Sequence, residues 1–177
     1  MTVDQIIDGI LEREGGYDDH PSDKGGPTNM GVTAVVLGEW RHLGRAATRE
    51  EVKNLQPAEA RAICRARYIA GPGFERIPFE PLRAQLCDFG YNSGPARAIR
   101  WLQRVLQAPE TGVLDALTLA ELGRHDAHLV NDALVAARLY MVDRWSDADK
   151  RQKVFEEGVE SRALEFFLSR PLEGGVQ

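Results

Sequence analysis

One irregular segment, residues 17–32, most constrains the fold, because the rest of the chain has helical periodicity. The segment is rich in Gly, Asp and Pro, so we expect a loop with room for a short β-hairpin. Before it, Gly15-Gly16 is expected to end a first helix, whose apolar residues recur at helical spacing as Val3, Ile6, Ile7, Ile10 and Leu11. From about Thr33 onward the pattern is helical almost to the end. The sequence therefore predicts an α+β domain, mostly α, with its irregular part near the N-terminus.

Local signals mark several later helices. Residues 48–51, "TREE", fit a capping box, and Pro57 and Pro95 suit first helical positions. A stripe of apolar residues is expected on the helix after Thr33, and it would consist of Val35, Val36, Trp40 and Leu43. Trp101 and the leucines around it lie at core spacing. No linker or repeat interrupts the 177 residues, so we expect a single domain.

Composition excludes several classes of protein. The formal net charge of -5 argues against a nucleic-acid partner, although it leaves room for a local basic groove. No apolar run reaches the roughly 20 residues of a membrane helix, and the N-terminus lacks the basic start and apolar run of a secretory signal. We therefore expect synthesis in the cytoplasm without membrane insertion. Cys64 and Cys87 are expected to be buried, reduced thiols, and neither has the spacing of a zinc site, so we expect no metal and no cofactor.

Glu14 is the strongest catalytic candidate among the residues of the loop and its borders. It lies at the predicted C-terminal end of the first helix, where the helix dipole disfavours a charged carboxylate, as would burial beside Tyr17. A glutamate that stays protonated near neutral pH can act as a general acid. The alternative is a solvated glutamate in a frayed last turn.

Asp18, Asp19 and Asp23 are candidates for a second carboxylate. Glycoside hydrolysis pairs a general acid with a carboxylate that acts as nucleophile or as base for water. Asp23 follows Glu14 by nine positions with a turn between them, so the two could face one cleft. The same aspartates could instead cap turns.

Polar residues after the turn offer further contacts. Thr28, Asn29 and Thr33 could place a water or hold a sugar, and Thr33 could equally be the N-cap of the next helix. His20 has no neighbouring ligands of the kind that a metal needs, and we expect it to be a surface residue.

Three ordered motifs resemble glycoside hydrolase family 108, a family of phage- and prophage-type endolysins that act as N-acetylmuramidases. They are "EGGY" at 14–17, "GGPTNMGVT" at 25–33 and "NSGPARAIRWLQRVL" at 92–106. The resemblance implies a lysozyme-like fold, with a small β-hairpin beside a cleft. It implies cleavage of the β-1,4 bond between N-acetylmuramic acid and N-acetylglucosamine in peptidoglycan. It also divides the domain of residues 1–177 into a catalytic part, 1–88, and a helical part, 89–170, that resembles a predicted peptidoglycan-binding region.

The resemblance also implies site residues. Glu14 matches the catalytic glutamate of the family, and the spacing of Glu14, Asp23 and Thr28 is similar to the Glu, Asp and Thr set of T-even phage lysozymes. The chain departs from the family at Met30, Ile69 and near Val159, where an aromatic residue is common. We expect substrate contacts from seven further residues: Tyr17, Asn29, Thr33, Tyr68, Asp88, Tyr91 and Asn92.

Two other functions remain open at this point. A lytic transglycosylase can also use one catalytic glutamate, and a non-catalytic peptidoglycan-binding protein would need none. For the muramidase we expect a monomer that binds peptidoglycan strands. We also expect it to depend on a holin or another release system, not necessarily through direct contact, to reach the wall in the periplasm. The sequence separates the muramidase from the transglycosylase poorly, whereas an intact Glu14 followed by its glycine turn argues against the non-catalytic protein.

Overall fold

The computed structural model describes residues 2–19, 26–148 and 153–167, and the chain divides into two compact units, Met1–Glu75 and Arg76–Gln177. The chain passes from one unit to the other in the short 3-10 turn Phe74–Arg76. Helix α5 (Glu80–Ser93) is continuous through residue 88, and the expected end of the catalytic part at that residue stays a prediction.

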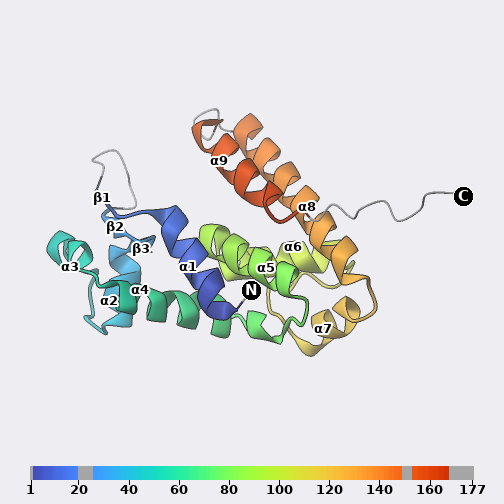
Figure 1. Cartoon of the computed structure of the whole chain (residues 1–177), viewed down its shortest axis with the longest axis horizontal. Helices are drawn as coiled ribbons and strands as arrows, with labels where there is room; N and C mark the ends of the chain where they lie inside the picture. Colours follow the sequence, from blue (N-terminus) through green and yellow to red (C-terminus); the bar gives the residue numbers. More distant parts are fainter. Residues whose placement is uncertain (1, 20–25, 149–152, 168–177) are drawn as a thin grey trace, which may run out of the picture. The chain divides into compact units, whose positions relative to one another are not determined.

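The first unit places a small sheet among short helices (Figure 1). Helix α1 (Val3–Glu14) leads into the strands β1 (Tyr17–Asp18), β2 (Thr28–Asn29) and β3 (Val32–Thr33). Three helices follow, α2 (Ala34–Trp40), α3 (Arg49–Lys53) and α4 (Pro57–Cys64), and a π-helical segment, η1 (Arg65–Ala70), extends α4. With the helical second unit, this arrangement confirms the expected α+β lysozyme-like class.

The three strands form an antiparallel sheet in the order β1-β2-β3. Only Met30 and Gly31 connect β2 to β3, and both have positive φ values, 49° and 71°. Two consecutive residues with positive φ make the type I′ turn that matches the twist of a hairpin. The hairpin predicted for the irregular segment is therefore present.

The core of the first unit lies between the sheet and α2 to α4. Leu37, Val52 and Ile63 are fully buried there. Helix α2 approaches the following loop so closely that a Cβ on Gly38 would lie 2.1 Å from the carbonyl oxygen of Arg45, so only glycine fits. The predicted stripe was wrong for Val35, which is 54% exposed, because α2 turns Ala34, Leu37 and Gly38 inward instead.

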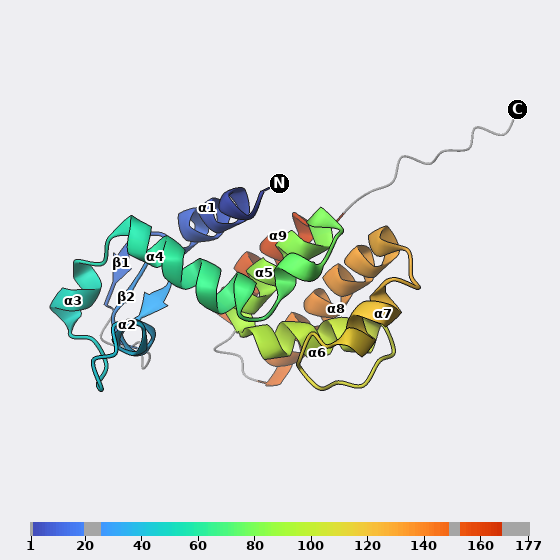
Figure 2. The ribbon, with the colours of Figure 1, turned by 90° about the horizontal axis from the view of Figure 1, so that it is seen from below.

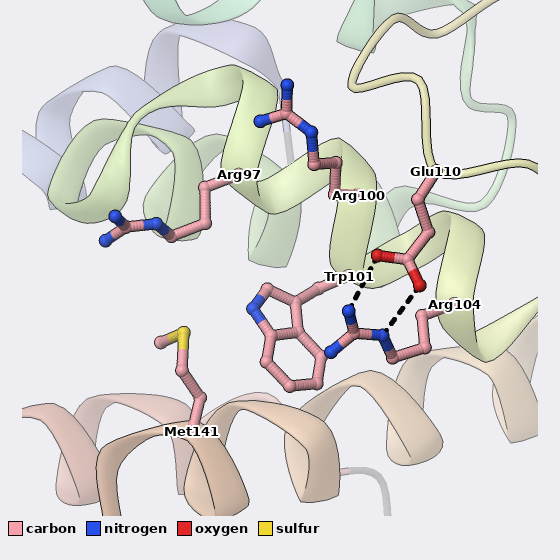
Figure 3. A pocket seen from close by; sticks show the side chains of 6 residues that line it. All are labelled: Arg97, Arg100, Trp101, Arg104, Glu110 and Met141. Carbon is pink, nitrogen blue, oxygen red and sulfur yellow. Dashed lines mark hydrogen bonds and ion pairs between the residues drawn. The ribbon is translucent and has the colours of Figure 1, made fainter. Parts of the chain in front are cut away.

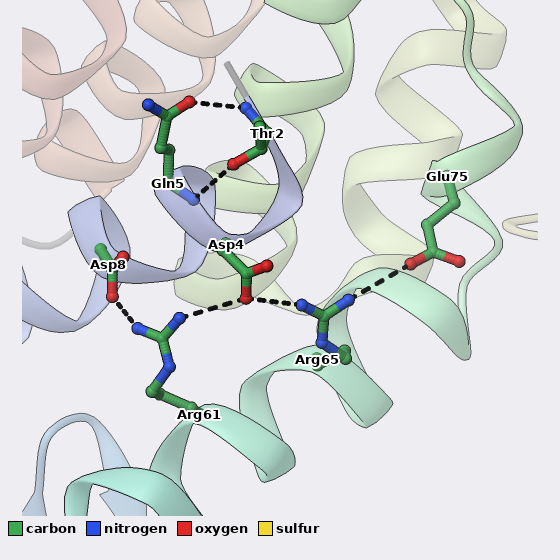
Figure 4. A network of polar contacts seen from close by, with 7 residues as sticks. All are labelled: Thr2, Asp4, Gln5, Asp8, Arg61, Arg65 and Glu75. Atoms are coloured by element: carbon green, nitrogen blue, oxygen red, sulfur yellow. Dashed lines mark hydrogen bonds and ion pairs between the residues drawn. The ribbon is translucent and has the colours of Figure 1, made fainter.

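Ion pairs fix α1 on α4 (Figure 4). Arg61 contacts the carboxylates of both Asp4 and Asp8, and Arg65 bridges Asp4 at 2.7 Å and Glu75 at 3.9 Å. Each group is partly solvated, so a single pair stabilises by less than about 1 kcal/mol. Their joint effect is to set the position of α1, the helix that ends at Glu14.

The second unit consists of helices, of which α5, α6 and α8 pack on one another and α9 packs on α8 (Figure 2). It contains α6 (Pro95–Val105), α7 (Ala116–Leu122), α8 (Ala127–Ala148) and α9 (Lys153–Leu164). Helix α5 packs against α6 and α8 and buries residues on all sides, including Phe89 and Asp88. A charged side chain such as Asp88 needs an oppositely charged partner in this core, and Arg138 of α8 supplies it.

Trp101 of α6 lines a hollow of about 260 Å³ whose walls also include Arg104 and Met141 (Figure 3). The guanidinium carbon of Arg104 lies 4.4 Å from the centroid of the Trp101 ring, and Glu110 holds that guanidinium group with two hydrogen bonds, of 2.9 and 2.7 Å. Trp101 is half-exposed, so its predicted place in the core was wrong, whereas Leu102 beside it is fully buried.

Candidate active site

Glu14 is the last residue of α1, and its position follows from the residue after it. Gly15 has φ 73°, a left-handed conformation in which glycine avoids the strain of a Cβ, and the helix ends there. The Glu14 side chain is half-buried. The glycine pair thus separates Glu14, at the end of α1, from the first strand.

The Glu14 carboxyl group lies close enough to Cys64 and Tyr68 for its charge to act on both. Burial raises the pKa of the Cys64 thiol to about 12, Arg61 and Arg65 oppose this rise, and Glu14 adds to it. Burial likewise raises the pKa of the Tyr68 hydroxyl, with a further contribution from Glu14. Tyr68, predicted as a substrate contact, is half-buried in the π-helical segment η1. The structure therefore brings together Glu14 and Tyr68, which are 54 positions apart.

The sheet aligns a second group of candidates. In its register Asp18 lies opposite Thr28, and Thr28 lies opposite Thr33. Directly opposite residues of antiparallel strands point to the same face, so these three side chains form one polar row. Of the two described aspartates among these candidates, Asp18 and Asp19, Asp18 is the one that the sheet places opposite Thr28. Alternation of side chains along a strand could have revealed this row once the register was known.

Thr33 also performs the structural role that the sequence left open. Its hydroxyl oxygen accepts a hydrogen bond from the backbone N–H of Val36 at 3.2 Å, which makes it the N-cap of α2. This confirms the capping alternative, and a substrate contact by Thr33 stays a prediction.

The opposite face of the sheet is turned toward the core at β2 and β3. Asn29 is 7% exposed, and its Nδ2 donates to the carbonyl oxygens of Val52 at 3.0 Å and Lys53 at 3.2 Å. These carbonyls lie at the end of α3, where the Val52 carbonyl also accepts from the backbone N–H of Leu55 at 3.1 Å. The amide of Asn29 therefore anchors β2 to α3, and this use of its donor group does not support the expected contact with a sugar.

Tyr17 begins β1 and is 38% exposed. Its hydroxyl donates to Asp19 at 3.2 Å, and Asp19 is ion-paired with Arg49 at 3.0 Å. Local desolvation and then this hydrogen bond raise the pKa of the Tyr17 hydroxyl. Asp19 is thus engaged with Tyr17 and Arg49, as a turn-stabilising residue would be.

Two of the predicted residues, His20 and Asp23, lie outside the described residues. Among the residues that are described, no group of three or more His, Cys, Asp and Glu side chains could hold a metal ion. Over the same residues, none of the helices combines the length and the apolar character that a membrane crossing requires. Cys64 and Cys87 are both buried, as expected.

The remaining three predicted contacts belong to α5 in the second unit. Asp88 is 1% exposed and its Oδ2 accepts from Nη2 of Arg138 at 2.9 Å, so the expectation that its side chain lines a cleft is corrected to a core ion pair. Asn92 is exposed; its Nδ2 donates to the carbonyl of Asp88 at 2.8 Å, and its Oδ1 accepts from Arg162. Tyr91 is half-buried. Sequence alone missed Arg138 as the partner of Asp88, because 50 positions separate them.

Comparison with known proteins relates these features to a family. The model of the glycosyl hydrolase 108 family matches residues 7–94, which include Glu14, the sheet and α5. Eleven chains of solved structures match, among them the structure of SagA from Brucella abortus, with 34% sequence identity and a TM-score of 0.76. That match covers 94% of this chain and 95% of SagA. A comparison with curated proteins finds no significant match.

Proposed function

Because this chain belongs to the glycosyl hydrolase 108 family, it is a glycoside hydrolase directed at peptidoglycan, and we propose that it is an N-acetylmuramidase with Glu14 as general acid. The bond cleaved is the β-1,4 linkage from N-acetylmuramic acid to N-acetylglucosamine. The observation that carries the proposal is the position of Glu14. It is half-buried at the end of α1, beside Tyr68 and directly before the strand that carries Asp18.

Glu14 would protonate the glycosidic oxygen as the bond to the sugar breaks. General acids contribute roughly 10²- to 10⁴-fold to such reactions. Tyr68 is proposed as a contact that holds the sugar next to this carboxyl group.

The second carboxylate is proposed to be Asp23, with Thr28 as its companion in placing the attacking water. Thr28 stands opposite Asp18 on β2, so Asp18 is the alternative for this role. Substitution of each aspartate shows which of the two, Asp23 or Asp18, is the second carboxylate. Asp23→Asn should remove most of the activity and Asp18→Asn little of it, and the reverse result would assign the role to Asp18.

The biological role that we propose is that of an endolysin in lysis by a phage or prophage. Its support is the resemblance of the three ordered motifs to that family. The helical part, residues 89–170, which extends beyond the family match at residue 94, is proposed to contribute to peptidoglycan binding. That the protein is a monomer, and that it depends on a holin or another release system, remain predictions.

Mass spectrometry of the products from purified peptidoglycan tests the proposed bond and the reaction class together. A muramidase leaves reducing N-acetylmuramic acid ends. Ends with 1,6-anhydro-muramic acid would instead identify a lytic transglycosylase. Sedimentation with the wall and no soluble product would identify a non-catalytic binding protein, and reducing N-acetylglucosamine ends would contradict the bond assignment.

A further inference from the structure

The helix that begins at Pro57 changes its hydrogen-bond pattern at η1, which has π-helical geometry. The backbone N–H of Gly71 donates to the carbonyl oxygen of Ala66 at 2.9 Å, so this bond joins residues five positions apart instead of the four of an α-helix. A π turn therefore holds one residue more than the α-helical turn it replaces. Such turns are rare and frequently lie at functional sites, and this one carries Tyr68.

Gly71 is required at the end of this turn by the space around it. Its φ of -56° and ψ of -48° are ordinary helical values, so a side chain would not strain the backbone. A Cβ would, however, lie 2.8 Å from the carbonyl oxygen of Ala66, the acceptor of the π-type hydrogen bond. The obstacle is backbone, so an alanine at this position must displace the carbonyl and disrupt the bond. Because Gly71 is exposed, the added methyl group would alter the turn and not the core.

Three side chains of η1 fix the turn on its neighbours in the first unit. Arg65 pairs with Asp4 of α1 at 2.7 Å (Figure 4). Arg67 pairs with Glu39 of α2, and Ile69 is fully buried in the core. A change of one residue in helical register rotates a side chain by about 100°. The turn therefore cannot give up its extra residue without breaking contacts to these neighbours.

Tyr68 lies between these anchored residues and is half-buried. Burial raises the pKa of its hydroxyl group, and the charge of Glu14 adds to the rise, so the phenol stays neutral and can donate a hydrogen bond. Glu14 ends α1, the same helix to which Arg65 ties the turn through Asp4. The extra residue of the π turn thus sets the direction in which the Tyr68 side chain leaves a helix that is fixed to the helix of Glu14.

We propose that Gly71 is a positioning residue of the active site, because the π turn that it permits directs the phenol of Tyr68 toward the sugar bound at Glu14. Tyr68 contacts the substrate, and Gly71 acts only through Tyr68. A phenol offers an apolar ring face to a sugar together with a hydroxyl group that donates or accepts a hydrogen bond. The inference rests on the function proposed above, since it needs a sugar at Glu14.

Steady-state hydrolysis of soluble, uncross-linked peptidoglycan strands by the full chain tests the proposal. A side chain that holds the sugar equally in the ground state and in the transition state affects KM and leaves kcat unchanged. Tyr68→Ala should therefore raise KM at least about fivefold, the effect of one lost hydrogen bond, with kcat within about twofold. Gly71→Ala should raise KM to a similar extent and keep the far-UV spectrum of the unaltered chain.

The double variant Gly71→Ala/Tyr68→Ala separates a positioning role from a general loss of structure. If Gly71 acts through Tyr68, its substitution adds nothing once the phenol is absent, so the double variant should have the KM of Tyr68→Ala. Gly9→Ala is the matched control. Gly9 is a helical glycine of the same unit, but the nearest atom to a Cβ there would be Nη1 of the flexible Arg13 side chain, at 3.7 Å, which is an ordinary contact. Its kinetic constants should equal those of the unaltered chain.

Glu14→Gln, measured in the same assay, distinguishes failure of this inference from failure of the proposed function. An unchanged rate in Glu14→Gln would contradict the proposed function, whatever Gly71→Ala does. With Glu14→Gln inactive, three results would overturn the role of Gly71. They are an unchanged KM in either single variant, a further rise in KM from Tyr68→Ala to the double variant, and a Gly71→Ala chain that does not fold. The last result would show that this exposed glycine supports the whole unit instead of one turn.

Discussion

The buried ion pair between Asp88 and Arg138 leads to the largest expected effect on stability. Their side chains are 2% and 1% exposed, and Nη2 of Arg138 lies 2.9 Å from Oδ2 of Asp88. The guanidinium carbon also lies 4.8 Å from the centroid of the Phe89 ring, inside the same core. In Asp88→Ala this cation would remain buried after its carboxylate is gone. We expect a loss of about 3–5 kcal/mol in the free energy of unfolding.

Urea denaturation followed by far-UV circular dichroism measures this loss, and the melting temperature should fall by roughly 6–20 °C for a chain of this size. Asp88→Leu/Arg138→Met should recover most of the loss, because an apolar pair needs no charge compensation. Glu121→Ala, which breaks the exposed pair with Arg124, is the control and should cost less than about 1 kcal/mol. A loss below about 1 kcal/mol in Asp88→Ala would refute the reasoning. So would a stable variant that has lost activity, since Asp88 would then act on substrate.

Three further predictions concern the first unit. Hydrogen bonds from Arg45 and then from the Thr48 backbone lower the pKa of Glu51 to about 2, so its stabilising contribution is present above the ordinary value of 4.5 and is lost as pH falls toward 2. An NMR titration should show that midpoint, Arg45→Gln should raise it, and a midpoint near 4.5 in the unaltered chain would contradict the assignment. Asn29→Ala should cost about 1–3 kcal/mol in urea denaturation, since the Val52 and Lys53 carbonyls lose the side-chain donor that they share, and unchanged stability would exclude the anchoring role. Arg61→Gln should cost less than about 1 kcal/mol in the same assay, and a larger loss would mean that the ion pairs on α1 act as a cooperative network.

Local chemistry made the ends of several elements predictable. Thr48 and Glu51 form the expected capping box, Pro57 and Pro95 open helices, and Gly15 ends α1, because each of these signals depends only on neighbouring residues. The hairpin was predictable for the same reason.

Contacts between distant residues were not predictable in this way. Asp88 appeared to be a polar residue near a helix end, and only packing of α8 on α5 places Arg138 beside it. Asn29 likewise gained its partners from α3, more than 20 positions later. The π-helical segment around Tyr68 has no sequence signature that a periodicity of 3.6 residues would reveal. These are the positions where tertiary packing decides the role of a side chain.

The most direct test of the central claim compares lysis of purified peptidoglycan by Glu14→Gln and Glu12→Gln. The two glutamates lie on the same helix, two positions apart, and Glu12 is exposed while Glu14 is half-buried. If Glu14 is the general acid, its variant should lose at least about 100-fold in rate while it keeps the far-UV spectrum and melting temperature of the unaltered chain. Glu12→Gln should retain the full rate. Lysis by a folded Glu14→Gln variant at an unchanged rate would contradict the assignment of Glu14 and, with it, the proposed mechanism.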